Sequence, residues 1–307
     1  MTVALLDGDI VAYRCAIVNE VDFDGDKIFD APSVERSIDT MVQSWQTMAK
    51  AGSSIVCLSD ITHKYFRHII YPQYKANRKG SARPVGLGHA IKYLEDNYKI
   101  ARRPGLEADD VMGIFAGSKH ISDPVIVSID KDMMTVPGRV LNPNKMNRAQ
   151  KISERSADRM MFYQALVGDS TDGYPGAKGI GPKKAEKLLD EHANPLRLWD
   201  AMVKLFDNEE QATLMVQLAR ILRHTDYNEE TGEVRLWSAS NPNLWITSTP
   251  DITSEEESKP LITSEPSVET SPETKPSTLE TSSSTSQDTK PRIRKTRRKT
   301  SRKRSGT

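Results

Sequence analysis

The sequence predicts an α/β fold, in which a parallel sheet lies between helices, followed by a helical part and a disordered tail. Three short apolar runs, "VALLD", "SIVCLSD" and "PVIVSID", each finish on an acid, at Asp7, Asp60 and Asp130. Continuous β-branched runs of this length are typical of strands that are covered on both faces. Because helical patterns separate the runs, the order of elements is that of an α/β protein.

The helical patterns follow from the spacing of apolar residues. Ile38, Val42 and Trp45 recur at the three-and-four spacing of an amphipathic helix, and a similar pattern follows residue 110. After Ser153 the strand signals stop, and the helical segments "SADRMMFYQALVGD", "GPKKAEKLLDEH" and "EEQATLMVQLARILRH" come next. We expect these helices to pack against the sheet, with a small hairpin near "YNEETGEVRLW".

Composition divides the chain into three parts. From Ile246 onward there is no Phe, Trp or Tyr, and Ser, Thr, Glu and Pro dominate, so residues 246–307 are predicted to be disordered. The last 18 residues hold ten lysines and arginines and no acid. We expect an α/β core over residues 1–152 and a helical subdomain over residues 153–245.

The chain has the features of a soluble cytoplasmic protein. Its two cysteines, Cys15 and Cys57, lie in apolar surroundings, which favours buried free thiols in a reducing cytosol over a metal site. The N-terminus lacks the basic region and long apolar core of a signal peptide. No apolar run approaches the roughly 18 residues of a membrane span, so we expect no membrane partner.

Acids gather at the predicted strand ends and helix starts, where ligands of open α/β sheets bind. Glu107 and Asp110 are three residues apart in "EADD", so both lie on one side of a helix. Asp130 and Asp132 share one face if the strand continues through "SIDKD". The set has nine members: Asp7, Asp60, Glu107, Asp109, Asp110, Asp130, Asp132, Asp169 and Asp172.

Carboxylates that are crowded in this way need a cation, because two charges 4 Å apart repel by about 4 kcal/mol at an effective dielectric constant near 20. Oxygen-rich clusters suit Mg²⁺ or Mn²⁺. Two such ions can activate a water and stabilise the leaving oxygen of a phosphoryl displacement. The alternative is that single acids such as Asp109 and Asp169 only cap helices, and we interpret Asp9 as a capping or spectator acid.

A glycine-rich segment, "GYPGAKGIGPKKAEKLL", begins at Gly173. Glycines ahead of a proline at a first helical turn leave backbone N–H groups pointing outward, which makes an anion-binding end. The lysines beside it add charge for a phosphate backbone; the alternative is a plain glycine turn. The residues expected to bind the backbone are Gly176, Gly179, Gly181, Lys183 and Lys184.

A second basic stretch, "YPQYKANRKGSARP", follows the run that ends at Asp60. Cations and aromatic rings interleave in it, the combination with which proteins bind the end of a nucleic-acid strand. The alternative is a solvated loop. The residues concerned are Tyr71, Tyr74, Lys75, Arg78, Lys79 and Arg83.

Taken together, these motifs resemble the flap endonuclease or 5′-3′ exonuclease superfamily, whose fold is PIN-like. "LLDGD", "YKANRK", "GLEADDVMG", "SIDKD" and "GDSTDGYPGAKGIG" stand in the order of that family, over about residues 1 to 225. The chain is most similar to the free-standing exonucleases of short-tailed bacteriophages. The resemblance implies a PIN-like nuclease core with a helix-hairpin-helix subdomain and removal of nucleotides from 5′ ends.

The resemblance also assigns roles to residues. It implies that Asp7, Asp60, Glu107, Asp109, Asp110 and Asp130 hold or organise a first Mg²⁺ or Mn²⁺, and that Asp132, Asp169 and Asp172 hold a second. It implies that Lys75 and Arg78 contact the scissile phosphate and that Tyr74 stacks on the terminal base. Gly176, Gly179 and Gly181 would bind the duplex backbone, with a K⁺ ion as a further candidate.

We therefore expect a monomeric, metal-dependent 5′-3′ exonuclease that acts on double-stranded DNA with 5′ ends, and on RNA primers in RNA/DNA hybrids. The alternatives are a structure-specific flap endonuclease, a PIN-type ribonuclease and a non-catalytic DNA-binding module. The segment between Arg78 and Glu107 is short for an arch that threads a flap. The basic end of the tail is predicted to be a non-specific DNA tether.

Overall fold

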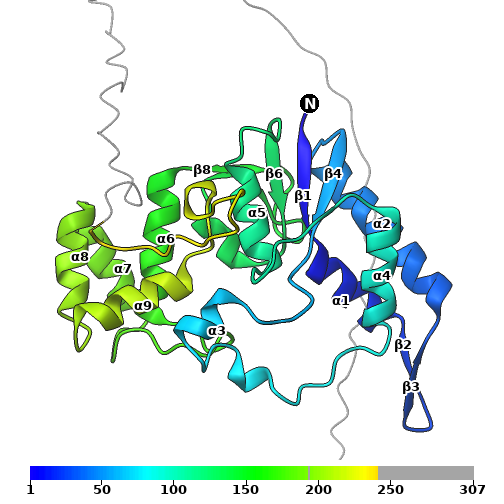
Figure 1. Ribbon diagram of the computed structural model, residues 1–307, viewed down its shortest axis with the longest axis horizontal. Coiled ribbons are helices and arrows are strands. Elements are labelled where there is room, and N and C mark those ends of the chain that lie inside the picture. The colour runs from blue at the N-terminus through cyan, green and yellow to red at the C-terminus, as the bar shows by residue number, and fades with distance from the viewer. Residues whose placement is uncertain (193, 241–307) are drawn as a thin grey trace, which may run out of the picture. The chain divides into compact units, whose positions relative to one another are not determined.

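The apolar runs form the centre of a six-stranded sheet in the computed structural model, which describes residues 1–192 and 194–240 (Figure 1). The strand order is β5-β4-β1-β6-β7-β8, and all neighbours are parallel except β7 and β8, which are antiparallel. The strands are β1 (Val3–Asp7), β4 (Ser53–Cys57), β5 (Ile100–Ala101), β6 (Pro124–Val127), β7 (Gly138–Leu141) and β8 (Gln150–Ile152). The predicted α/β class is confirmed.

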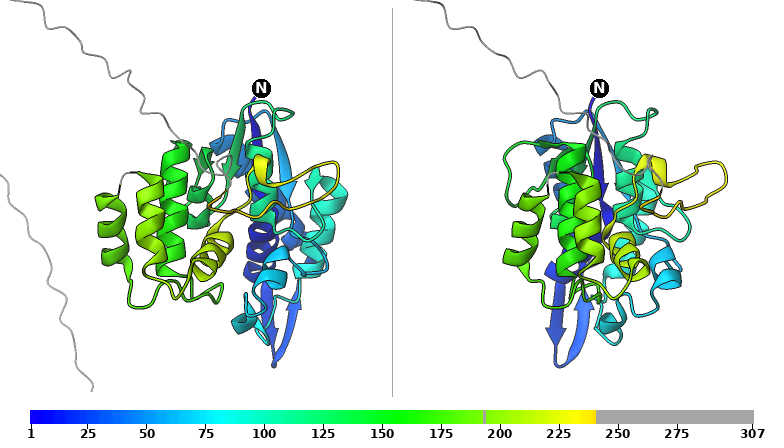
Figure 2. Two further views of the ribbon diagram at one scale, coloured as in Figure 1. Left: turned by 60° about the vertical axis from the view of Figure 1, so that its left-hand side comes forward. Right: turned by 90° about the vertical axis from the view of Figure 1, so that its left-hand side faces the viewer.

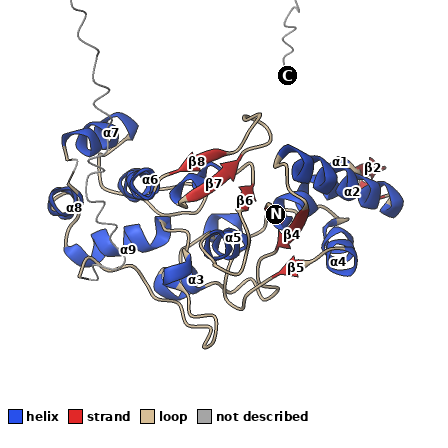
Figure 3. Cartoon of the chain, turned by 90° about the horizontal axis from the view of Figure 1, so that it is seen from above, coloured by secondary structure: helices blue, strands red, loops and turns tan. Residues whose placement is uncertain are grey.

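Helices cover both faces of this sheet because side chains alternate along each strand. Leu6 of β1 is buried with residues of α1 (Gly8–Val18), α2 (Ala31–Met48) and α4 (Leu87–Asn97), whereas its neighbour Leu5 is buried with residues of α5 (Ala108–Ala116). Figure 3 shows α1, α2 and α4 on one side of the strands and α5 on the other. The carboxyl ends of β1, β4 and β6 therefore lie together at one edge.

The second half of the chain is helical, as expected. Its core includes Trp199 and Trp237, whose rings lie 5.0 Å apart, and Tyr74 and Tyr174 belong to the same buried cluster. The helices are α6 (Glu154–Val167), α7 (Pro182–Glu191), α8 (Pro195–Val203) and α9 (Glu209–Ala219). Pro182 occupies the first turn of α7, where its missing N–H costs no hydrogen bond. A single bridge pairs Tyr227 with Val234 at the expected hairpin.

Several elements were not predicted. A hairpin of β2 (Glu20–Phe23) and β3 (Asp26–Phe29) connects α1 to α2 and projects from the sheet domain (Figure 2). Short helical turns are α3 (Phe66–Ile70), η1 (Ala76–Arg78), η2 (Lys131–Thr135) and η3 (His224–Asp226). Because η2 follows β6, the chain turns at Asp130 and the strand does not continue through "SIDKD". Asp130 caps this turn by accepting a hydrogen bond from the Asp132 N–H.

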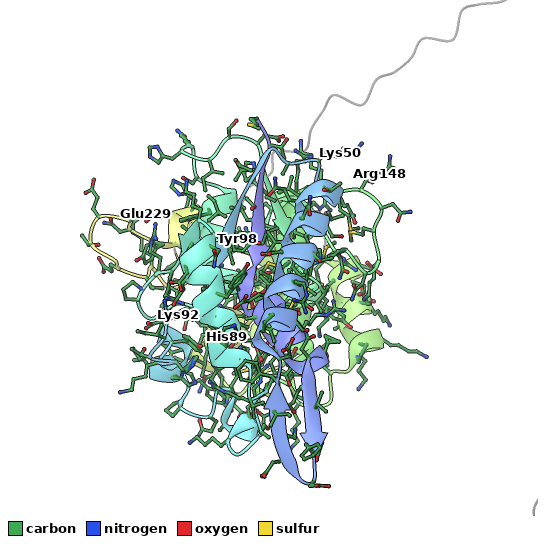
Figure 4. All side chains as sticks on the ribbon, turned by 90° about the vertical axis from the view of Figure 1, so that its right-hand side faces the viewer. Lys50, His89, Lys92, Tyr98, Arg148 and Glu229 are labelled. Carbon is green, nitrogen blue, oxygen red and sulfur yellow. The ribbon has the colours of Figure 1, made fainter. Side chains whose placement is uncertain are left out.

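Polar contacts fix α4 against α2. His89 lies 2.9 Å from Glu35, and the hydroxyls of Tyr93 and Tyr98 both donate to Asp39 (Figure 4). All described residues belong to one compact unit, Met1–Thr253. Among them, no helix is both long and apolar enough to cross a membrane. The predicted disordered tail, with its basic end, lies outside the described residues.

Candidate metal centre

The first group of acids begins at the carboxyl end of β1. Asp7 is 2 % exposed; it caps α1 by accepting from the Ile10 N–H and also accepts from the Ser128 hydroxyl at 2.7 Å. The Ser128 hydroxyl in turn accepts from the Asp130 N–H at 3.0 Å, so one serine joins two acid-bearing segments. Burial and the nearby charges of Asp9 and Asp130 raise the pKa of Asp7 to about 7.

The acidic turn at the start of α5, which carries Asp109, lies near Asp7 and Asp130. Burial raises the pKa of Asp109 well above its ordinary value, and the charges of Asp7, Asp130 and Glu107 raise it further. Asp9 is also part of this group, because its carboxylate accepts from the Ser59 N–H and hydroxyl while burial raises its pKa. Asp9 thus stands in the first turn of α1 and fixes Ser59, while its predicted role as a capping or spectator acid stays a prediction.

A second group of acids lies around Asp132. Burial raises the pKa of Asp132 to about 7, and Asp130, Asp169 and Asp172 add to the repulsion. The loop after α6 carries Asp169 and Asp172, and Asp169 accepts from the backbone N–H groups of Thr171 and Asp172. Asp130 links the two groups, because its N–H donates to the Ser128 hydroxyl that contacts Asp7 and its carboxylate accepts from the Asp132 N–H.

Three side chains from the basic stretch contact Glu107 of the acidic turn or Asp172 of the loop after α6. Lys75 Nζ lies 2.5 Å from Glu107 and 3.6 Å from Asp172, and Arg78 lies 2.7 Å from Asp172. The Tyr74 hydroxyl donates to Glu107 and Asp172 at 2.9 and 3.0 Å. Burial alone would raise the pKa of Glu107, but Lys75 and Arg67 bring it below its ordinary value.

The structure corrects the role of Tyr74. Its ring is 3 % exposed and lies between the side chains of Arg67, Lys75 and His68, so it is not free to stack on a substrate base. The hydroxyl instead ties the acidic turn of α5 to the loop after α6. Lys79, in contrast, is exposed on the same stretch.

Asp110 and Asp60 accept hydrogen bonds that hold the acidic turn and the loop before it in place. Arg67 donates to both Asp110 oxygens, at 2.6 and 2.8 Å, and Asp110 also accepts from the Leu222 N–H. Asp60 accepts from the Gly105 N–H and the Thr62 hydroxyl, which fixes the loop that leads to Glu107 and lowers the pKa of Asp60. Both carboxylates are engaged with protein groups, which suits the organising role that the resemblance implied for them as an alternative to direct metal binding.

The glycine-rich segment has two kinds of glycine. A Cβ on Gly176 would lie 2.4 Å from the Gly168 nitrogen, so Gly176 serves close packing of the segment against the end of α6. A Cβ on Gly179 or Gly181 would meet nothing within 4 Å, so these two face open space. Lys183 and Lys184 are exposed beside them, and Lys184 donates to the Gly179 carbonyl.

Sequence reasoning missed the residues that hold the acids in place. Ser128, Ser59 and Arg67 are polar residues within or beside apolar stretches, and each proves to contact an acid of the site. Gln164 of α6 likewise donates its amide to Asp132. A polar residue that interrupts an apolar pattern was the available signal.

The donor set fits hard divalent cations. Within residues 1–192 and 194–240, no three His, Cys, Asp or Glu side chains already converge on one point as ligands. Asp7 is buried and Asp109 and Asp132 are half-buried, and desolvation together with neighbouring acids raises the pKa of each. Carboxylate oxygens of this kind are the ligands that Mg²⁺ and Mn²⁺ prefer.

A parallel sheet whose carboxyl edge carries two linked groups of acids, next to a helical part with a glycine-rich loop, is the arrangement expected of a metal-dependent nuclease. Two family profiles identify it further. The 5′-3′ exonuclease N-terminal resolvase-like domain matches residues 2–159, and the 5′-3′ exonuclease C-terminal SAM fold matches residues 156–241. The chain belongs to the 5′-3′ exonuclease family.

Two phage exonucleases are similar to this chain over about three quarters of its length. The chain is 28 % identical to the exonuclease of Escherichia phage T7 over 278 residues, which covers 76 % of this chain and 93 % of the relative. It is 26 % identical to the exodeoxyribonuclease of Enterobacteria phage T3, over 77 % of this chain and 92 % of the relative. The resemblance to phage exonucleases is confirmed.

A solved structure shows the same fold. The T5 5′-exonuclease with bound zinc matches with a TM-score of 0.54 at 21 % identity, covering 71 % of this chain and 89 % of that chain. This match supports the PIN-like core with its helical part.

Proposed function

We propose that this 5′-3′ exonuclease removes nucleotides from the 5′ ends of duplex DNA with two divalent cations held by its acids. The observation that carries the proposal is that Asp130 is hydrogen-bonded toward both acid groups, through Ser128 to Asp7 and directly to the Asp132 N–H. When bound, two cations supply an activated water and stabilise the leaving oxygen of an in-line displacement.

We propose the following metal ligands and phosphate donors. Asp7, Glu107, Asp109 and Asp130 would hold the first cation, and Asp130, Asp132, Asp169 and Asp172 the second. Lys75 and Arg78 lie beside these acids and are the donors that we propose for the scissile phosphate, because charge-assisted hydrogen bonds to phosphate are strong. Asp9 would support the first group through Ser59.

The helical part supplies the duplex contact. Gly179, Gly181, Lys183 and Lys184 present open backbone and positive charge, which suits a phosphate backbone without reading its sequence. A K⁺ ion beside these glycines is part of this proposal, and so is action on RNA/DNA hybrids, because contacts of this kind do not depend on the base. We propose that the chain works as a monomer.

These separate roles support a domain boundary near Ile152, because β8 ends at that residue and α6 begins shortly after it. We propose residues 1–152 as the nuclease core, residues 153–245 as the DNA-binding subdomain and residues 246–307 as a separate tail. The buried free thiols Cys15 and Cys57 suit a reducing compartment, and we propose that the enzyme acts in the cytoplasm of the host cell.

We infer that exonuclease activity exceeds flap activity. Between η1 and α4 the chain runs through residues 79–86, and no helix forms in that connection. A connection this short offers no helical arch for threading a single-stranded flap. We therefore expect cleavage at blunt and nicked duplex ends to exceed cleavage of long flaps.

One substrate panel tests the proposal. Blunt duplex, nicked duplex, 5′ flap and RNA-primed hybrid, each labelled at the 5′ end, are incubated with Mg²⁺ and with EDTA. We expect short labelled products from the duplexes with Mg²⁺ only. Asp130→Asn and Asp132→Asn should abolish cleavage while binding of the blunt duplex in Ca²⁺ persists. Cleavage in EDTA, or by both variants, would refute the metal site.

A further inference from the structure

A glutamine of the helical part contacts one of the proposed metal ligands. Gln164 lies on α6 and is 4 % exposed, and its Nε2 donates a hydrogen bond to Asp132 Oδ1. Among the described residues, this is the only side-chain hydrogen bond that Asp132 accepts; the nearest cation, Lys131, is 3.9 Å away. The orientation of the Asp132 carboxylate therefore depends on Gln164.

The other end of the same amide is unsatisfied. Gln164 Oε1 is buried and finds no hydrogen-bond partner within the described part of the chain. A buried polar atom without a partner costs about 1–3 kcal/mol. This orientation of the amide is still the favoured one. In the rotated orientation, Oε1 would face the Asp132 carboxylate and the hydrogen bond from Nε2 would be lost. The amide orientation is set by Asp132 and by no other group that the structure describes.

The main chain of Gln164 reaches the second acid-bearing loop. Its carbonyl oxygen accepts from the Gly168 N–H at 2.7 Å, which ends α6 directly before Asp169. Gln164 thus contacts Asp132 through its side chain and fixes the start of the loop of Asp169 and Asp172 through its backbone. Gln164 therefore joins the helical part to the turn that follows β6.

We propose that Gln164 is a positioning residue for the second cation: its amide fixes the Asp132 carboxylate so that the remaining oxygen, Oδ2, is directed to the cation. The inference rests on the proposed function, because it requires Asp132 to be a metal ligand. Hydrogen-bond partners of metal ligands fix ligand orientation, and their loss typically costs roughly 10–100-fold in metal affinity or activity.

The test replaces the amide with an apolar side chain of similar length. Mn²⁺ binding to full-length Gln164→Met is measured by electron paramagnetic resonance without DNA, beside steady-state cleavage of a 5′-labelled duplex. We expect a roughly 10–100-fold weaker Mn²⁺ site, a matching rise in the Mn²⁺ needed for half-maximal turnover, and an unchanged KM for DNA. The melting temperature should change little, because the hydrogen bond lost by Asp132 is offset by removal of the unsatisfied oxygen.

A second variant controls for the loss of a hydrogen-bonded helix amide, at the half-buried Gln217. Gln217 of α9 donates to the Trp237 carbonyl and contacts no acid of the site, so Gln217→Met should leave Mn²⁺ binding unchanged. Equal weakening in both variants would overturn the proposal, because it would indicate general loosening of the helices. Should Gln164→Met fail to fold, Gln164→Leu is measured in the same way.

The Asp132→Asn background separates this inference from the proposed function. If Gln164 acts through Asp132, adding Gln164→Met to Asp132→Asn should weaken Mn²⁺ binding by no more than about twofold, because coupled residues are non-additive. If Asp132→Asn weakens binding but Gln164→Met does not, the proposed site stands and the positioning role falls. If Asp132→Asn itself binds Mn²⁺ normally, the second cation site falls and this inference with it.

Discussion

Lys75 Nζ lies 2.5 Å from Glu107 Oε1. The side chain of Lys75 is 18 % exposed, and its backbone adopts a left-handed conformation with φ 54°. A non-glycine residue in this region is uncommon. The turn at Lys75 thus directs an ammonium group toward Glu107 and Asp172, where we propose that it contacts the scissile phosphate.

The first prediction concerns this ammonium. Lys75→Met should lower kcat by roughly 10²–10³-fold, the usual loss when one donor to a developing negative charge is removed. Duplex binding in Ca²⁺ should persist, because the phosphate contacts of the helical part remain. Lys92→Met is the control, since Lys92 pairs with Asp96 on the surface of α4. Wild-type kcat in Lys75→Met would contradict the assignment.

The second prediction concerns the buried pair of Arg67 and Asp110. The side chains are 4 % and 0 % exposed, so Arg67→Met leaves a buried carboxylate without its partner. The free energy of unfolding should fall by about 3–5 kcal/mol, as measured by urea unfolding followed by tryptophan fluorescence. Replacing both, as Arg67→Met with Asp110→Leu, should recover most of the loss. Arg36→Met at an exposed pair should change little.

The third prediction concerns pH. The pKa values of Asp7 and Asp132 are raised to about 7, so without metal the folded chain binds more protons than the unfolded chain between about pH 4 and 7. Stability of the metal-free protein should therefore fall as pH rises through this window. Cations need the ionised carboxylates, so Mg²⁺ should raise the melting temperature far more at about pH 8 than at about pH 5. An equal rise at both would contradict the metal site.

The fourth prediction concerns the contact between Gly168 and Gly176. Gly168 has φ +76°, and a Cβ there would lie 2.4 Å from the Pro175 carbonyl carbon. Gly168→Ala should therefore lower stability by at least about 1–3 kcal/mol and weaken Mn²⁺ binding, because the loop of Asp169 and Asp172 must move. Gly88→Ala, on the open face of α4, should instead stabilise by about 0.5–1 kcal/mol. Calorimetry and Mn²⁺ titration distinguish the two.

Much of the fold follows from the sequence because burial dictates its pattern. The runs that became β1, β4 and β6 are apolar because both faces of the sheet are covered. The β2–β3 hairpin was missed because its Val21, Phe23 and Ile28 are exposed, so no buried face imposes a pattern on them. The edge strands β5 and β8 are too short to give a signal.

The positions of the acids also follow from the sequence, but the contacts of each acid do not. Asp109 and Asp110 are neighbours in the chain, yet Asp110 is engaged by Arg67, which is 43 residues away. In the sequence, Tyr74 stands among basic residues, as an exposed ring that stacks on a base would. In the fold it is buried, and its hydroxyl lies between Glu107 and Asp172. Long-range partners decide which member of an acidic cluster stays open to a ligand.

The hydrogen bonds of Arg67 to the carbonyl oxygens of Leu218 and Arg220 limit how this enzyme can be dissected. These oxygens belong to the far end of the helical half, yet the guanidinium that they orient holds the acidic turn of α5. A fragment that ended at Ile152 would keep Asp7, Asp109, Asp130 and Asp132 but lose Asp169, Asp172 and the scaffold of that arginine. Grafting the α/β half onto a foreign targeting module would therefore transfer the chemistry only if the segments around residues 169–172 and 218–222 travelled with it.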